Sequence, residues 1–114
     1  MSPDTRFRLE DMRRFAQEAI ELLGERSAAE ILGERIRELA LVRLVELVGE
    51  AAARISDEAR REHPNLPWRE AVGLRNILIH GYGQIKIDIV VGTVREHFPP
   101  LVEALGRILG GQGQ

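Results

Sequence analysis

The sequence contains no cysteine, and this absence excludes several kinds of chemistry together. Disulfides, thiol nucleophiles and thiolate metal sites are all ruled out. A chain without cysteine also fits a reducing compartment, so we expect a cytoplasmic protein. The N-terminal stretch is charged from Asp4 onward, and no apolar run approaches the ~18 residues of a membrane span. The sequence therefore predicts a soluble protein that has no membrane partner.

An excess of positive charge is also missing. The chain has 16 basic and 18 acidic residues, which gives a formal net charge of -2. A protein with this balance has no global positive field to hold a nucleic acid non-specifically. Any contact with RNA must therefore be local. The 114 residues suffice for one domain with a hydrophobic core of its own.

Motifs for binding a metal ion or a nucleotide are absent as well. The three histidines, His63, His80 and His97, do not follow the HExxH pattern or a similar ligand spacing. The glycines around Tyr82 are not followed by the lysine and threonine of a P-loop. We therefore expect neither a metal nor a cofactor. His63 and His97 are interpreted as charges at the C-terminal ends of helices.

Helical periodicity runs through most of the chain and predicts an all-α fold. The class expected is an up-and-down bundle of four long helices plus a short C-terminal helix. It should form a single domain over residues 1–109, followed by a disordered Gly/Gln tail at 110–114. The first expected helix covers residues 3–23 and begins after a Ser2 cap. A capping box at 27–30 precedes a long second helix, from Gly33 to about Arg61. Further helices are expected at 67–81, 87–97 and 101–109.

The stretch "QIKIDIVVGTV", residues 84–94, gives two conflicting signals. Its β-branched residues alternate with polar ones at first, which favours a strand. A single strand would have no partner, because nothing else in the chain resembles one. We therefore predict a helix here, with poor intrinsic propensity, that is held by packing.

The long second helix is apolar over more than one stripe. Eight of the ten residues from Leu39 to Val48 are apolar, which covers more of the helix surface than one buried face requires. One side would face the domain core and the other a second subunit, so a homodimer is predicted. A helix that lies at the centre of a monomer is the alternative explanation.

Four polar side chains gather where the third helix ends, in "RNILIHGYG". Asn76 and His80 are four residues apart, and Arg75 and Tyr82 are seven apart, so all four lie along one rim of the helix. The opposite arc carries Ala71, Leu74, Ile77 and Leu78, which should anchor the helix in the core. A purely structural role is the alternative: Arg75 would pair with an acid, His80 would cap the helix and Tyr82 would be a half-buried aromatic.

The pattern R-N-x-x-x-H-x-Y, with "HPNLPWREAVGL" before it and "IDIVVGTVREHFPPLVEAL" after it, resembles the HepT-like toxins of the HEPN superfamily. The stretch "LVELVGEAAARISDEARREHPNLPW" is also similar to that family, so the resemblance covers the chain from about Phe7 to Leu109. Two positions depart from it. The family often has an aromatic residue where this chain has Gly83, and often a tryptophan where it has Val91.

The resemblance implies a metal-independent ribonuclease that acts as the toxin of a toxin–antitoxin pair. In similar proteins two R-x4-H motifs meet in the cleft of a homodimer. His80 would then be the general base or acid, Arg75 would bind the scissile phosphate, and Asn76 would orient the histidine or the phosphate. The partner implied is an MNT-type nucleotidyltransferase antitoxin, which would transfer AMP to Tyr82.

Two other functions remain compatible with the same residues. One is a non-catalytic subunit that binds substrate for a nucleotidyltransferase. The other is a purely structural helical dimer. A requirement for Arg75 and His80 in RNA cleavage would separate the ribonuclease from both.

Overall fold

The chain is helical throughout the residues that the structure describes, which confirms the all-α class. The computed structural model describes residues 1–79 and 86–112, with side chains over 1–76 and 86–110. No strand occurs within these segments. In chain order the helices are α1 (Pro3–Leu23), α2 (Ala28–Leu32), α3 (Arg35–Ala53), α4 (Asp57–Glu62), α5 (Trp68–Ile79), α6 (Ile87–Glu96) and α7 (Phe98–Gln112).

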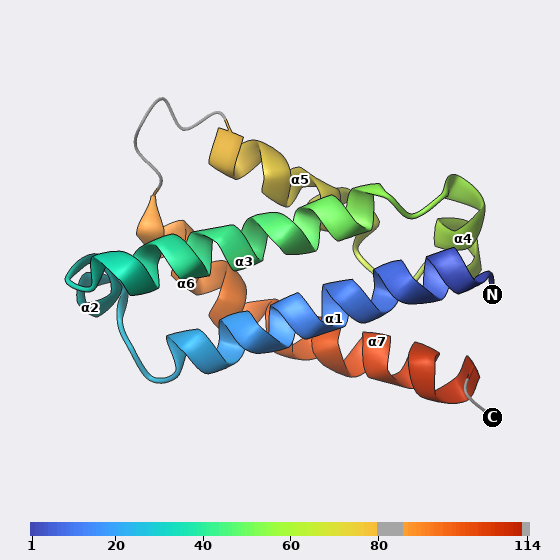
Figure 1. Cartoon of the computed structure of the whole chain (residues 1–114), viewed down its shortest axis with the longest axis horizontal. Helices are drawn as coiled ribbons and strands as arrows, with labels where there is room; N and C mark the ends of the chain where they lie inside the picture. The colour runs from blue at the N-terminus through green and yellow to red at the C-terminus, as the bar shows by residue number, and fades with distance from the viewer. Residues whose placement is uncertain (80–85, 113–114) are drawn as a thin grey trace.

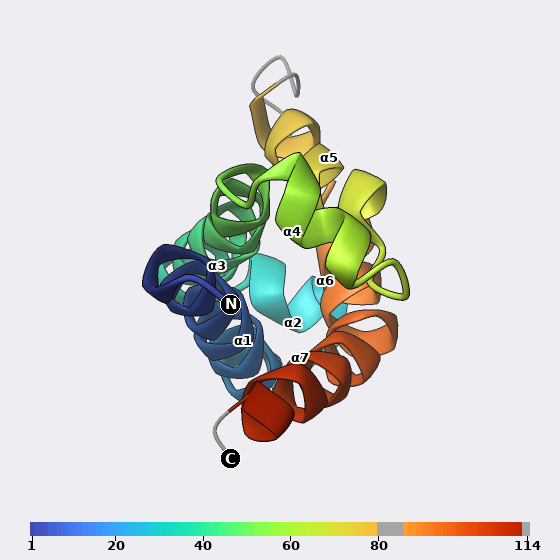
Figure 2. The ribbon, with the colours of Figure 1, turned by 90° about the vertical axis from the view of Figure 1, so that its right-hand side faces the viewer.

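The longer helices run along the molecule and enclose a common core (Figure 1). Helix α1 packs against α3 and α7, and α6 contacts α1, α2, α3 and α7. Helix α5 packs on α3, on the side of α3 that faces away from α1 (Figure 1). Figure 2 shows α1, α3, α6 and α7 arranged around the long axis, with α4 at the near end. Side chains that are fully buried in the core include Leu9, Met12, Leu41, Val48, Phe98 and Leu105.

The predicted starts of the first two helices are confirmed. The hydroxyl of Ser2 accepts a hydrogen bond from the Thr5 backbone N–H at 3.1 Å and caps α1. Ser27 and Glu30 form the reciprocal capping box at the start of α2. Gly24 ends α1 at φ 55°, a conformation that only glycine adopts without strain.

The ambiguous stretch at 84–94 is helical from Ile87 onward, as predicted, with Lys86 as the extended N-cap of α6. In α6 the buried side chains are Ile87, Val90, Val91 and Val94, which follow the i, i+3, i+4, i+7 spacing of one helix face. A strand that buried every second residue would bury Ile87, Ile89 and Val91 together, but Ile89 is exposed. Tertiary packing of this face therefore prevails over the low helix propensity of β-branched residues.

The prediction of one unbroken helix from Gly33 to about Arg61 was wrong. Helix α3 ends at Ala53, and α4 begins at Asp57 with Ser56 as its N-cap. The Ser56 hydroxyl accepts a hydrogen bond from the Ala59 backbone N–H at 3.2 Å. Ile55, between the two helices, is buried. Burying Ile55 and capping α4 both require the chain to turn at this point.

The last helix also differs from the prediction of a short element. Helix α7 has 15 residues and continues through Gly110 to Gln112, where the sequence predicts the start of a disordered tail. Pro99 and Pro100 lie in its first turn, where a missing backbone N–H has no helical partner to lose. Buried Phe98, Leu101 and Leu105 hold this helix to the core.

Helix lengths and hydropathy also bear on membrane insertion. Over the described part of the chain, no helix combines the length and the apolar character that spanning a bilayer requires.

Candidate functional site

Helix α5 carries the first half of the R-N-x-x-x-H-x-Y pattern and is fixed at its N-terminal end. Trp68 is half-buried against the core, and its indole Nε1 donates a hydrogen bond to the His63 carbonyl at 2.9 Å. Ala71 and Leu74 are buried, which confirms their predicted role as anchors. The side chains of Ile77 and Leu78, predicted for the same arc, lie outside the described ones.

Arg75 is half-buried on α5 and has no carboxylate partner. Its Nε is buried without any hydrogen-bond partner. All 18 acidic residues of the chain have described side chains, and none lies within the 4.0 Å of an ion pair with Arg75. Arg75 therefore does not pair with an acidic side chain of the same chain, contrary to what the structural alternative predicted. A guanidinium that is partly removed from water and lacks a counter-ion favours an anionic ligand.

The two acids that flank Gly49 in the sequence of α3 are engaged with another arginine. Arg43 forms ion pairs with both Glu46 and Glu50 along α3, with the Glu50 carboxylate at 3.5 Å. Other half-buried arginines reach an acid or a carbonyl: Arg26 and Arg37 share Glu34, and Arg60 donates to the Ala52 carbonyl at 3.1 Å. The Nε atoms of Arg8 and Arg60 are also buried without a hydrogen-bond partner, but Arg8 forms an ion pair with Asp4 at 3.9 Å and Arg60 has its carbonyl acceptor. Arg75 differs from them because it forms no ion pair or hydrogen bond with a described side chain.

Gly49 of α3 lies directly against Arg75. A Cβ at Gly49 would be 3.0 Å from the Arg75 Cγ, 3.0 Å from the Arg75 backbone N and 3.2 Å from the Ala71 carbonyl. Gly49 itself is buried. Sequence reasoning did not single out this residue, although an isolated glycine inside an apolar helical pattern is a signal for close packing.

The remaining residues of the pattern are placed only in part. Asn76 follows Arg75 on α5 and is exposed. His80 and Tyr82 lie outside the described residues, so their position relative to Arg75 remains a prediction from the sequence. The predicted common rim is thus described only at Arg75 and Asn76.

The other two histidines occupy the positions predicted for them. His63 is the C-cap of α4 and His97 is the C-cap of α6. In the described part of the chain, no group of three or more His, Asp or Glu side chains could hold a metal ion.

One carboxylate in the described region has a clearly shifted pKa. A hydrogen bond from Arg37 to Glu34, and a second from Arg26, lower the pKa of this carboxyl below its ordinary value. Both arginines also donate to the Leu22 carbonyl, and the cluster joins the end of α1 to the start of α3. The shift thus reflects a structural ion-pair cluster that does not include Arg75.

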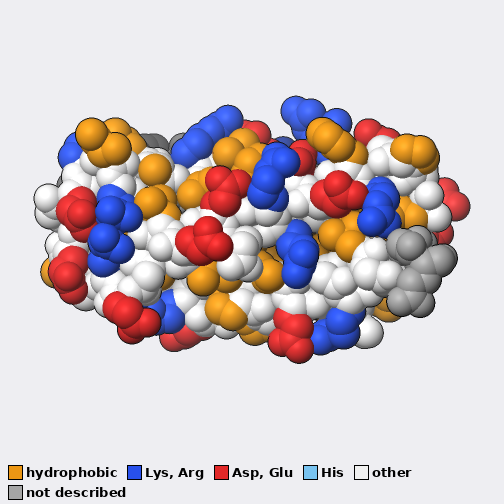
Figure 3. Space-filling view, turned by 60° about the horizontal axis from the view of Figure 1, so that its bottom comes forward, with side chains coloured by type: hydrophobic (Ala, Val, Ile, Leu, Met, Phe, Trp, Pro, Cys, Tyr) orange, Lys and Arg blue, Asp and Glu red, His pale blue; other side chains and the backbone are white. Residues whose placement is uncertain are grey.

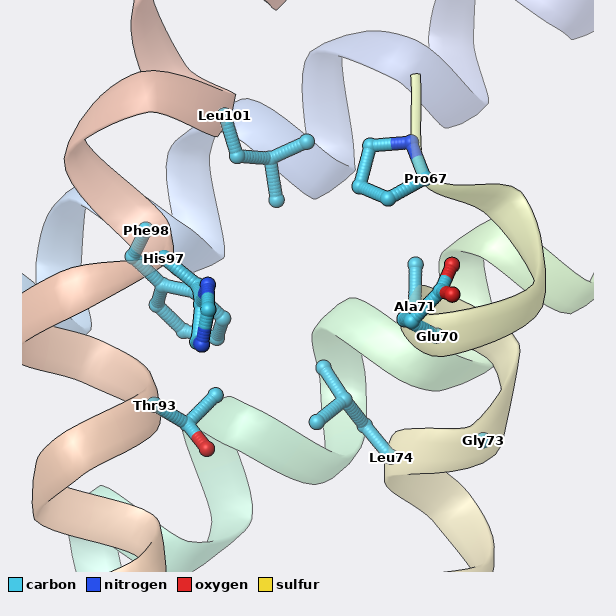
Figure 4. Close-up of a pocket in the computed structure, with 9 residues that line it drawn as sticks. All are labelled: Pro67, Glu70, Ala71, Gly73, Leu74, Thr93, His97, Phe98 and Leu101. Carbon is cyan, nitrogen blue, oxygen red and sulfur yellow. The ribbon is translucent and has the colours of Figure 1, made fainter.

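A cavity of about 560 Å³ lies on another side of α5, between this helix and the junction of α6 and α7 (Figure 4). Its walls are mainly apolar and include Ala71, Leu74, Phe98 and Leu101, with Glu70 and His97 as the titratable side chains. Apolar walls do not suit the charged phosphates of a nucleic acid. Arg75 does not line the cavity, so this space is not the predicted phosphate site.

Charges of both signs are mixed on the surface. On the face shown in Figure 3, arginine and acidic side chains alternate, with apolar atoms between them. Many charges of the chain form pairs within one helix, such as Arg6 with Glu10 at 2.9 Å and Arg14 with Asp11 at 2.9 Å. This face therefore presents no continuous basic patch, in agreement with the net charge of -2.

Comparisons with known proteins identify the family of the chain. A family model described as "Ribonuclease HepT-like" matches residues 12–108. "Putative RNase MJ1380" of Methanocaldococcus jannaschii is 35% identical over 98 residues, which cover 86% of this chain and 90% of the relative. "Probable ribonuclease HepT" of Thermococcus cleftensis is 35% identical over 88 residues, or 74% of this chain and 80% of that protein. No solved structure matches the chain. The chain belongs to the HepT-like ribonuclease family, as its sequence pattern predicted.

Proposed function

We propose that this protein is an endoribonuclease that acts as the toxin of a HepT/MNT-type toxin–antitoxin pair in the cytoplasm. The observation that supports this function most strongly is Arg75, a half-buried arginine that no acid of the chain neutralises. The names of the relatives quoted above point to the same activity. In this proposal the anion that completes the site is the scissile phosphate of an RNA.

The chemistry needs one base, one acid and one fixed positive charge. His80 takes the proton from a ribose 2′-hydroxyl, and the 2′-oxygen attacks the adjacent phosphorus. The bond from phosphorus to the 5′-oxygen breaks, and that oxygen receives a proton from the imidazolium of a His80 side chain. The products are a 2′,3′-cyclic phosphate and a 5′-hydroxyl. Arg75 stabilises the extra negative charge on the phosphate with its planar fork of donors, and Asn76 orients the phosphate or His80.

This mechanism is metal-independent in our proposal. The guanidinium supplies the charge stabilisation that a metal ion would otherwise give, and histidine titrates near neutrality, so it can serve as both base and acid.

We also propose a homodimer in which two such sites share one cleft. The apolar surface of α3 is covered in part by α1 and in part by α5 within one chain. Three apolar side chains at the end of α2 and the beginning of α3 nevertheless remain exposed: Leu32 at 58%, Ile36 at 84% and Leu39 at 51%. A second copy of the chain would cover them and account for the apolar character of α3 on more than one side.

The antitoxin would act on Tyr82. We expect an MNT-type nucleotidyltransferase to transfer AMP from ATP to the Tyr82 hydroxyl, with release of pyrophosphate. Tyr82 is seven residues from Arg75 in the sequence. A phosphate added to Tyr82 would therefore compete with RNA for the Arg75 guanidinium. Intact-mass analysis after incubation with the partner and ATP should show a gain of one AMP. The Tyr82→Phe variant should gain nothing, and an unmodified parent protein would refute this regulation.

A non-catalytic subunit of a nucleotidyltransferase remains the second candidate, because an unpaired arginine would also bind the phosphates of a nucleotide. Growth of a host that expresses the protein alone separates the two functions. We expect arrest with the parent protein and normal growth with an Arg75→Ala/His80→Ala double variant produced at the same level. Normal growth with both proteins would favour the subunit or the structural dimer, whereas equal arrest would show that the toxicity arises elsewhere.

A further inference from the structure

Helices α3 and α5 pack tightly against each other at Gly49. At this point a Cβ would come within 3.0 Å of the Arg75 backbone N and within 3.2 Å of the Ala71 carbonyl oxygen. Both are backbone atoms, so no side chain could rotate away to make room. Any residue other than glycine at position 49 would therefore push α5 away from α3 near Arg75.

The same contact affects the Arg75 side chain. A Cβ at position 49 would lie 3.0 Å from the Arg75 Cγ, so glycine leaves room for the aliphatic stem of the arginine on the surface of α3. The Nε is buried at this site and has no hydrogen-bond partner. Packing alone therefore restrains the first part of this side chain, since no carboxylate holds the guanidinium from its other end.

We propose that Gly49 is a positioning residue for Arg75: its missing side chain lets α5 and the arginine stem pack on α3, which fixes where the guanidinium meets the phosphate. This inference rests on the proposed ribonuclease function. A guanidinium that is restrained before RNA binds loses less conformational freedom on binding than an unrestrained one. Displacement of such a group by a fraction of an ångström weakens transition-state stabilisation without removing the charge.

Gly49→Ala is the variant that tests the inference, and Gly73→Ala is its matched control. At Gly73, on α5 itself, an added Cβ would meet nothing within 4 Å. We expect Gly49→Ala to lower the RNA cleavage rate by about 10- to 100-fold. Gly73→Ala should cleave at the parent rate. If Gly49→Ala lost its helical circular dichroism, it would be measured in the Gly73→Ala background, where the greater helix propensity of alanine stabilises α5.

Two further readouts distinguish positioning from a general structural effect. The first is binding of a short single-stranded oligonucleotide that is 2′-O-methylated and so cannot be cleaved. Arg75→Ala loses one phosphate contact and should reduce the slope of log K against log salt by about 0.7, whereas Gly49→Ala keeps the charge and should bind more weakly with the parent slope. The second is a double-mutant cycle, in which Gly49→Ala should cost little in a protein that already carries Arg75→Ala.

The outcomes separate this inference from the function on which it rests. If Arg75→Ala impairs cleavage while folded Gly49→Ala cleaves like the parent, the positioning role is refuted and the ribonuclease stands. Equal losses from Gly49→Ala in both backgrounds would also refute it, because the loss would not pass through Arg75. If Arg75→Ala cleaves normally, the proposed function fails first and the inference fails with it.

Discussion

Arg75→Ala should lower the rate of RNA cleavage by about 10² to 10³-fold, the usual cost of removing one electrostatic donor to a transition state. The fold should survive this change, because Arg75 makes no ion pair and its buried Nε lacks a hydrogen-bond partner. Single-turnover cleavage of a labelled RNA measures the effect, and thermal unfolding checks that the variant is folded.

Two companion variants make the Arg75 result specific. Arg75→Lys keeps the positive charge but loses the bidentate fork, so it should recover only part of the rate. Arg69→Ala removes an exposed arginine from the same helix, for which the described residues offer no ion-pair partner, and should cleave like the parent. Equal losses from Arg69→Ala and Arg75→Ala would show that cleavage responds to the general charge of α5.

His80→Ala should reduce cleavage by about 10² to 10⁴-fold, because general acid–base catalysis contributes a factor of this size. The parent rate should also change between about pH 5 and pH 8, where an unperturbed histidine titrates, and this dependence should disappear in the variant. Rates measured across that pH range at constant ionic strength test both expectations.

His97→Ala is the control for the loss of a histidine. His97 is exposed at the C-terminal end of α6 and does not belong to the R-x4-H pattern, so its removal should leave the rate and its pH dependence unchanged. Replacing the attacking 2′-hydroxyl of the RNA by hydrogen should abolish cleavage by every form of the protein. Cleavage of such a deoxy-substituted strand would exclude the proposed attack.

Local signals in the sequence predicted most helix ends. Ser2, Ser27 and Gly24 act through their immediate neighbours, so a cap or a stop can be recognised without knowledge of the fold. The turn at 54–56 was missed because Ser56 follows an apolar run whose periodicity continues past it. What ends α3 there is the burial of Ile55, which depends on the packing of distant helices.

The candidate site was predictable as a pattern but not as an environment. Spacing placed Arg75 and Asn76 on one rim and Ala71 and Leu74 on the opposite arc. The structure confirms that Ala71 and Leu74 are buried, but Arg75 and Ala71 both meet Gly49 of α3, so these two share one side of α5. That Arg75 has no acidic partner among the described side chains could not be predicted, because the sequence does not show which arginine Glu46 and Glu50 of α3 pair with. They pair with Arg43, which lies on their own helix.

The central claim is that Arg75 and His80 act on the same phosphodiester. A double-mutant cycle tests it most directly, with purified parent protein, Arg75→Ala, His80→Ala and the double variant cleaving one RNA in the presence of EDTA. Residues that act as a unit lose their effect together, so the double variant should be no slower than about the slower single variant. A parent that leaves the RNA intact, or a double variant whose loss is the product of the two single losses, would contradict the claim.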